Sequence, residues 1–141
     1  MLRRNGMGGH ILIIDDNPLD LRLASELLEM NGYTADSAPD AEQAQRMLLR
    51  MVPDLILMDI ALPGMDGLTL TRIVKADARL KHVPVVALTG FALRGDDQRA
   101  AAAGCDGYLT KPINTRSFAG QIGAILRESE ARRLHESPAL D

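Results

Sequence analysis

Hydrophobic residues follow two different spacings along the chain. Residues 11–14 and 55–58 are apolar at every position, which is typical of strands that are covered on both faces of a sheet. Between such runs, apolar residues such as Leu23 and Leu27 recur at the spacing of an amphipathic helix. The predicted strands are residues 11–14, 33–37, 55–58, 83–88 and 107–109.

Proline and asparagine mark where the predicted helices begin and end. Asn17 and Pro18 suit the N-cap and the first position of a helix. A second helix is predicted to open at Pro39, with apolar positions as far as Met51, before Pro53 breaks it. Apolar stripes indicate three further helices around residues 70–74, 100–103 and 118–126. Five strands that alternate with five helices predict an α/β fold, in which helices cover both faces of a parallel sheet.

The length of 141 residues fits one domain. We expect residues 1–9 to form a flexible N-terminal arm and residues 10–127 to form the domain itself. Residues 128–141 are predicted to be a helix extension that frays into a C-terminal tail. Because so few residues follow the last helix, the sequence predicts no output domain after it.

Charge and cysteine content exclude several classes of protein. The 16 basic and 19 acidic residues give a net charge of -3, which argues against a module that grips nucleic acid phosphates. The single Cys105 excludes an internal disulfide and is expected to be a packing residue. No apolar stretch approaches the roughly 18 residues of a membrane span, and no signal peptide is evident, so we expect a cytoplasmic protein without membrane contact.

Polar residues follow most of the predicted strands at the point where each strand ends. They are Asp15 and Asp16 after the first strand, Asp59 after the third, Thr89 after the fourth and Lys111 after the fifth. In open parallel sheets, ligands bind outside the carboxyl ends of the strands. The fold therefore predicts that three carboxylates, a hydroxyl and an ammonium group lie close together at one edge.

This set of side chains indicates the chemistry of the site. Three neighbouring carboxylates repel one another unless a cation is present, and an all-oxygen ligand set suits Mg²⁺. Lys111 adds a second positive charge, and fixed cations stabilise a phosphoryl group. A carboxylate can itself accept a phosphoryl group as a covalent intermediate.

The motifs that carry these residues resemble the receiver domain of two-component response regulators, the CheY-like superfamily. The resemblance covers roughly residues 10–127 and rests on the Asp15-Asp16 pair and on residues 57–67, 87–90 and 108–112. It implies the flavodoxin-like (βα)5 fold with strand order 2-1-3-4-5. It also implies that Asp59 is the phosphoacceptor. The protein would then be a phosphoprotein that carries 4-aspartylphosphate at this position.

The same resemblance assigns roles to the remaining site residues. The Mg²⁺ ligands it implies are Asp15, Asp16, Asp59 and the backbone carbonyl of Ala61. Thr89 and Tyr108 match the switch positions, and Lys111 matches the lysine that contacts the phosphate. A cis peptide bond is implied before Pro112.

Two residues are predicted to tune the lifetime of the phosphorylated state. Ala61 has no carboxamide or acid that would position an attacking water molecule. Phe91 would shield the phosphoryl group if its side chain points inward. We therefore hypothesise that the phosphoryl group is lost rather slowly.

The resemblance implies a signalling switch in a phosphorelay and not an enzyme. The phosphoryl donor would be a histidine kinase or a histidine phosphotransfer protein. A downstream protein would bind the surface formed by the helix before Gly104, the strand at residues 107–109 and the helix that carries Phe118. The chain would be a monomer or a phosphorylation-dependent dimer, without direct contact to nucleic acid. It resembles stand-alone regulators, with a receiver cut from a hybrid kinase or a larger regulator as the alternative.

Two other classes of protein are less consistent with the sequence. A Mg²⁺-dependent phosphatase of the haloacid dehalogenase type has an Asp-x-Asp motif at its nucleophile, whereas Ile60 and Ala61 follow Asp59 here. A flavodoxin-like carrier of FMN would need a loop that accepts phosphate, but the loop at residues 15–18 carries two acidic residues that would repel it. The two Tyr, two Phe and no Trp residues also leave little to flank a flavin.

Overall fold

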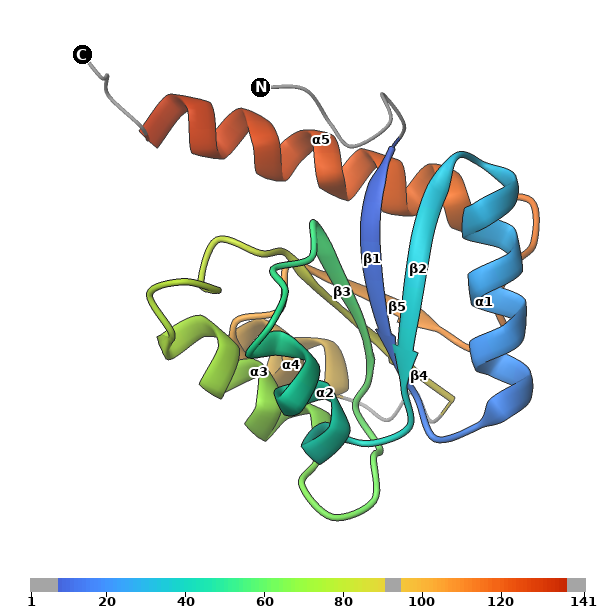
Figure 1. Ribbon diagram of the computed structural model, residues 1–141, viewed down its shortest axis with the longest axis horizontal. Coiled ribbons are helices and arrows are strands. Elements are labelled where there is room, and N and C mark those ends of the chain that lie inside the picture. Colours follow the sequence, from blue (N-terminus) through green and yellow to red (C-terminus); the bar gives the residue numbers. More distant parts are fainter. Residues whose placement is uncertain (1–7, 91–94, 137–141) are drawn as a thin grey trace.

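The computed structural model describes residues 8–90 and 95–136 (Figure 1). It contains a sheet with the strand order β2-β1-β3-β4-β5, in which all neighbouring strands are parallel. The strands are β1 (Gly9–Ile14), β2 (Tyr33–Ala38), β3 (Leu55–Asp59), β4 (Val85–Thr89) and β5 (Gly107–Thr110). The predicted α/β class and the flavodoxin-like strand order 2-1-3-4-5 are therefore confirmed.

Helices cover both faces of this sheet. They are α1 (Pro18–Met30), α2 (Ala41–Leu48), α3 (Gly67–Ala76), α4 (Asp96–Ala103) and α5 (Phe118–Glu136). Figure 1 shows α1 and α5 on one side of the sheet, and α2, α3 and α4 on the other. None of the helices in the described part of the chain is both long enough and apolar enough to span a membrane.

Two apolar layers hold the sheet between the helices. Side chains of a strand point alternately to its two faces, so Ile11 and Ile13 pack toward α1 and α5, whereas Leu12 and Ile14 pack toward α2 and α3. All four are buried. The central strands are apolar at every position because both faces contribute to the core.

The ends of several elements differ from the predictions made from the sequence. Helix α2 begins after Asp40, whose carboxylate accepts the backbone N–H of Gln43 as an N-cap, and it ends at Leu48, so Met51 lies outside it. Strand β4 begins at Val85 and not at residue 83, because Pro84 has no N–H with which to continue the ladder. These differences move the ends of the elements but not their order.

The first strand and the last helix reach beyond the limits that the sequence predicted for the domain. Strand β1 starts at Gly9, inside the segment that was predicted to be an arm. Helix α5 runs without a break from Phe118 to Glu136, and Arg132 on this helix forms an ion pair of 3.6 Å with Asp106. Residues 1–7 and 137–141, in the predicted arm and tail, lie outside the described residues.

Cys105 packs against the apolar layer beneath α2 and α3, although it is not fully buried. Its Sγ lies 3.8 Å from the hydroxyl oxygen of Thr71. Burial raises the pKa of this thiol, which keeps it in the poorly reactive protonated form. The structure thus supports its interpretation as a packing residue.

Candidate functional site

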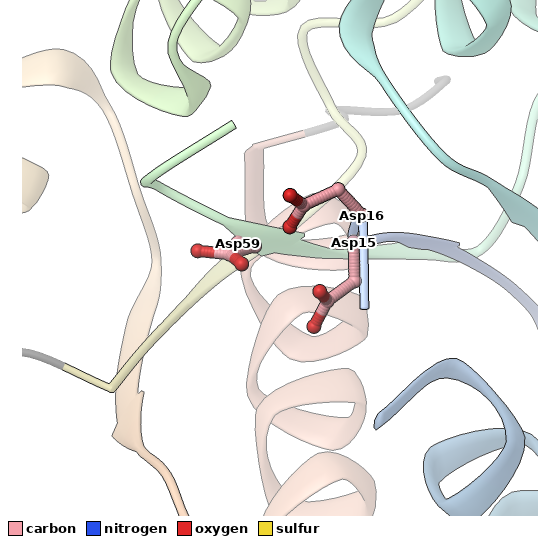
Figure 2. A group of neighbouring side chains, drawn as sticks. All are labelled: Asp15, Asp16 and Asp59. Atoms are coloured by element: carbon pink, nitrogen blue, oxygen red, sulfur yellow. The ribbon is translucent and has the colours of Figure 1, made fainter. Parts of the chain in front are cut away.

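The carboxyl ends of β1 and β3 bring three acidic side chains together. Asp15 and Asp16 follow β1, and Asp59 is the last residue of β3. One carboxylate oxygen from each of the three lies within 4.8 Å of the others. Figure 2 shows the three side chains gathered at the ends of the strands. The cluster that the fold predicted is therefore present.

Backbone amides fix the two buried carboxylates of the cluster. Asp15 and Asp59 are 1% and 5% exposed, whereas Asp16 is exposed to solvent. The Oδ1 atom of Asp15 accepts the N–H of Asn17 at 2.9 Å, and the Oδ1 atom of Asp59 accepts the N–H of Ala61 at 2.8 Å. Each of these bonds leaves the Oδ2 atom available for a cation.

Lys111 supplies a positive charge at this edge of the sheet. It follows β5, its backbone N–H donates to the carbonyl of Thr89 at 2.7 Å, and its peptide bond to Pro112 is cis. Its ammonium group faces three carboxylates. The distances from Nζ are 2.9 Å to Asp20 Oδ2, 3.0 Å to Asp15 Oδ2 and 3.2 Å to Asp59 Oδ2.

The pKa values of Asp15 and Lys111 are both raised, but for different reasons. Burial raises the pKa of the Asp15 carboxyl, against the opposing effects of the Asn17 amide and the Lys111 charge. Burial on its own would lower the pKa of the Lys111 ammonium, but the contacts with Asp20 and Asp15 outweigh it and raise that pKa. Lys111 therefore stays charged throughout the physiological range.

The donor set of the acidic cluster fits Mg²⁺. Asp15 Oδ2 is buried, and no group in the described part of the chain donates a well-aligned hydrogen bond to it; the nearby Lys111 makes an ionic contact. A buried carboxylate oxygen is costly without a nearby cation, and Lys111 Nζ at 3.0 Å shows that this oxygen faces positive charge. Together with Asp16 and Asp59 it offers only hard oxygen ligands, which Mg²⁺ prefers.

The predicted switch residues lie on the neighbouring strands. Thr89 is the last residue of β4, next to the cluster, and is 2% exposed. Tyr108 lies on β5, in register with Ala87 of β4, and is partly exposed. Phe91, which was predicted to shield the phosphoryl group, lies outside the described residues.

Asp20 is a site residue that the sequence reasoning missed. It lies in the first turn of α1, where an acidic residue is common because the positive end of the helix dipole stabilises its negative charge. Because the helix dipole alone explains an acidic residue here, nothing in the local sequence indicated its contact with Lys111, which follows β5 far along the chain. The available signal was the N-cap Asn17, which places residue 20 at the sheet edge where the other strand-end groups gather.

Comparisons with known proteins agree with this geometry. Residues 11–122 match the family model described as response regulator receiver domain. The chain is 38% identical over 119 residues to the polar-differentiation response regulator DivK of Brucella ovis, and the match covers 84% of this chain and 97% of that protein.

Solved structures of receiver domains are similar too. The CheY-like receiver domain protein of Methanospirillum hungatei is 29% identical, with a TM-score of 0.80 over 87% of this chain and 97% of that one. The receiver domain of a histidine kinase from Syntrophus aciditrophicus is 32% identical, with a TM-score of 0.78 over 85% and 91% of the two chains. Fold, clustered acids and sequence match together show that this chain belongs to the response regulator receiver domain family.

Proposed function

We propose that Asp59 accepts a phosphoryl group from a phosphohistidine of a histidine kinase or a histidine phosphotransfer protein. The observation that carries this proposal is the position of Asp59, which has a carboxylate oxygen within 4.8 Å of the acidic pair and Oδ2 3.2 Å from the Lys111 ammonium. In the proposed step, a carboxylate oxygen of Asp59 forms a bond to phosphorus. The phosphorus–nitrogen bond breaks, and its electron pair stays on the imidazole.

The proposed cofactor is Mg²⁺, held by Asp15, Asp16 and Asp59 and, as the family resemblance implies, by the carbonyl of Ala61. When bound, it supplies positive charge that offsets the charge of the phosphoryl oxygens. Lys111, whose Nζ lies 3.2 Å from Asp59 Oδ2, donates hydrogen bonds to the same oxygens. Ala61 offers no group that activates water, which supports slow loss of the phosphoryl group.

We propose that the signal leaves through the α4-β5-α5 surface. Thr89 and Tyr108 lie on the paired strands β4 and β5, so a shift of Thr89 toward a phosphoryl group acts directly on the neighbouring strand. Tyr108 and Phe118 also line a cleft between β5 and α5. Phosphorylation adds roughly -1.5 to -2 charges and biases conformations that already exist.

The proposed role is that of a switch without substrate turnover, either a monomer or a dimer formed on phosphorylation. Its partners are the phosphoryl donor and a downstream protein. We propose that this phosphoryl transfer takes place in the cytoplasm, where Cys105 would stay a free thiol.

Incubation with acetyl phosphate and Mg²⁺ tests the acceptor residue. We expect the intact mass to rise by one phosphoryl group in the wild type, and no adduct to form in Asp59→Asn, which lacks the attacking carboxylate. Asp36→Asn is the matched control, because this exposed aspartate on β2 pairs with His10 far from the cluster. A covalent adduct that persists in Asp59→Asn contradicts the assignment.

Thermal unfolding at increasing Mg²⁺ concentration tests the metal ligands. A cation that binds the folded state raises the melting temperature, so the wild type should become more stable as Mg²⁺ is added. Asp16→Asn should need at least about tenfold more Mg²⁺ for the same gain, because it removes the exposed carboxylate of the set. An unchanged Mg²⁺ dependence in Asp16→Asn argues against this ligand, with Asp36→Asn again as the control.

A further inference from the structure

Asp20 approaches the site through Lys111 and not through the acidic cluster. Its Oδ2 atom lies 2.9 Å from Lys111 Nζ, which is the shortest of the three carboxylate contacts of that ammonium group. Among the described residues, the acids grouped closely enough to share a metal ion are Asp15, Asp16 and Asp59, and Asp20 is not among them. Its side chain is 28% exposed, more than those of the other two carboxylates that contact Lys111.

The ammonium group of Lys111 has only three N–H bonds to give. In this structure it faces three carboxylates at 2.9–3.2 Å, one of them Asp59. A phosphoryl group on Asp59 would bring additional anionic oxygens into reach of the same ammonium group. Those oxygens and the carboxylate of Asp20 then compete for the same donors and the same charge.

We propose that Asp20 is a positioning residue that holds Lys111 in the unphosphorylated state and thereby weakens the affinity of the site for a phosphoryl group. The inference rests on the proposed function, in which Asp59 carries that group. Asp20 acts through the lysine because its contact is with Nζ. Its contribution to the first turn of α1 is a separate, structural effect that the test must not confuse with this one.

Beryllofluoride, an analogue of the phosphoryl group, is the probe, and its binding in the presence of Mg²⁺ is followed by ¹⁹F NMR. We expect Asp20→Asn to bind it about three- to tenfold more tightly than the wild type, because a carboxylate that competes for Lys111 is gone. Glu29→Gln is the matched control, since it removes one negative charge from the opposite end of the same helix. Unchanged or weaker binding by Asp20→Asn overturns the proposal.

A double-mutant cycle separates an effect through Lys111 from a general effect of charge. In a Lys111→Met background, we expect Asp20→Asn to change beryllofluoride binding by less than about twofold, because the shared partner is absent. The same gain with and without Lys111 overturns the proposal. Where Lys111→Met binds the probe too weakly, the ¹⁵N signal of Lys111 Nζ decides: it shifts in Asp20→Asn under the proposal, and an unmoved signal overturns it.

The wild type separates this inference from the function on which it rests. If the wild type fails to bind beryllofluoride, the proposed role of Asp59 is wrong and the role of Asp20 falls with it. If the wild type binds and Asp20→Asn matches Glu29→Gln, only the role of Asp20 is wrong. Thermal unfolding of each variant reports the structural contribution of Asp20 separately.

Discussion

Gly67→Ala should destabilise the protein by about 2–3 kcal/mol, because the added methyl group collides with the backbone that carries Asp59. A Cβ atom at this position would lie 2.5 Å from the carbonyl oxygen of Asp59 and 2.7 Å from the Cα atom of Ile60. Both are backbone atoms, so no flexible side chain can move aside. Either the first turn of α3 or the end of β3 must shift.

The hydrogen bonds around Gly67 make such a shift costly. Its N–H donates to the carbonyl of Ile60 at 3.2 Å, and its own carbonyl accepts the hydroxyl of Thr71 at 2.8 Å. A retreat of α3 weakens the first of these bonds, and an outward movement of β3 displaces Asp59. We therefore expect Gly67→Ala to slow phosphorylation as well as to lower stability.

Urea unfolding followed by circular dichroism measures this change. The control is Gly120→Ala on α5, where a Cβ atom meets nothing within 4 Å and where alanine should stabilise the helix by about 0.5–1 kcal/mol. We expect the free energy of unfolding to fall in Gly67→Ala and to rise in Gly120→Ala. Equal unfolding midpoints for Gly67→Ala and the wild type would show that the backbone relaxes at no cost.

The acidic cluster was predictable from sequence because two simple rules act together. The runs before Asp15 and Asp59 are apolar at every position, which marks strands that are buried on both faces. Once these strands are parallel, their carboxyl ends lie at one edge whatever the details of the loops. The same rules place Thr89 and Lys111 at that edge, and the structure finds both there.

Local detail that depends on competing signals was not predictable in the same way. Pro39 suits the first turn of a helix, yet Asp40 caps α2 with its carboxylate and the helix begins at Ala41, two residues after Pro39. The contact between Asp20 and Lys111 joins two segments far apart in the chain, and its geometry depends on how the first turn of α1 and the residue after β5 meet at the edge of the sheet. Spacing along a sequence carries no information on a distance of that kind.

Lys111→Met should make the stability of the protein strongly dependent on Mg²⁺. The substitution removes the ammonium group that faces three carboxylates, of which Asp15 and Asp59 are almost fully buried. Breaking a buried ion pair by removing one partner costs about 3–5 kcal/mol. Asp20 is partly exposed and water can reach it, so we expect a loss of about 2–3 kcal/mol without Mg²⁺.

The measurement is the melting temperature in EDTA and at increasing Mg²⁺ concentration. Mg²⁺ at the cluster offsets the charge that the lysine no longer balances, so we expect it to restore most of the lost stability in Lys111→Met and to stabilise the wild type less. Lys81→Met, at an exposed lysine, is the control and should behave like the wild type. A Lys111→Met protein that is as stable as the wild type in EDTA would show that the ammonium group does not balance these carboxylates. A deficit that Mg²⁺ leaves unchanged would show instead that the cluster does not bind the cation.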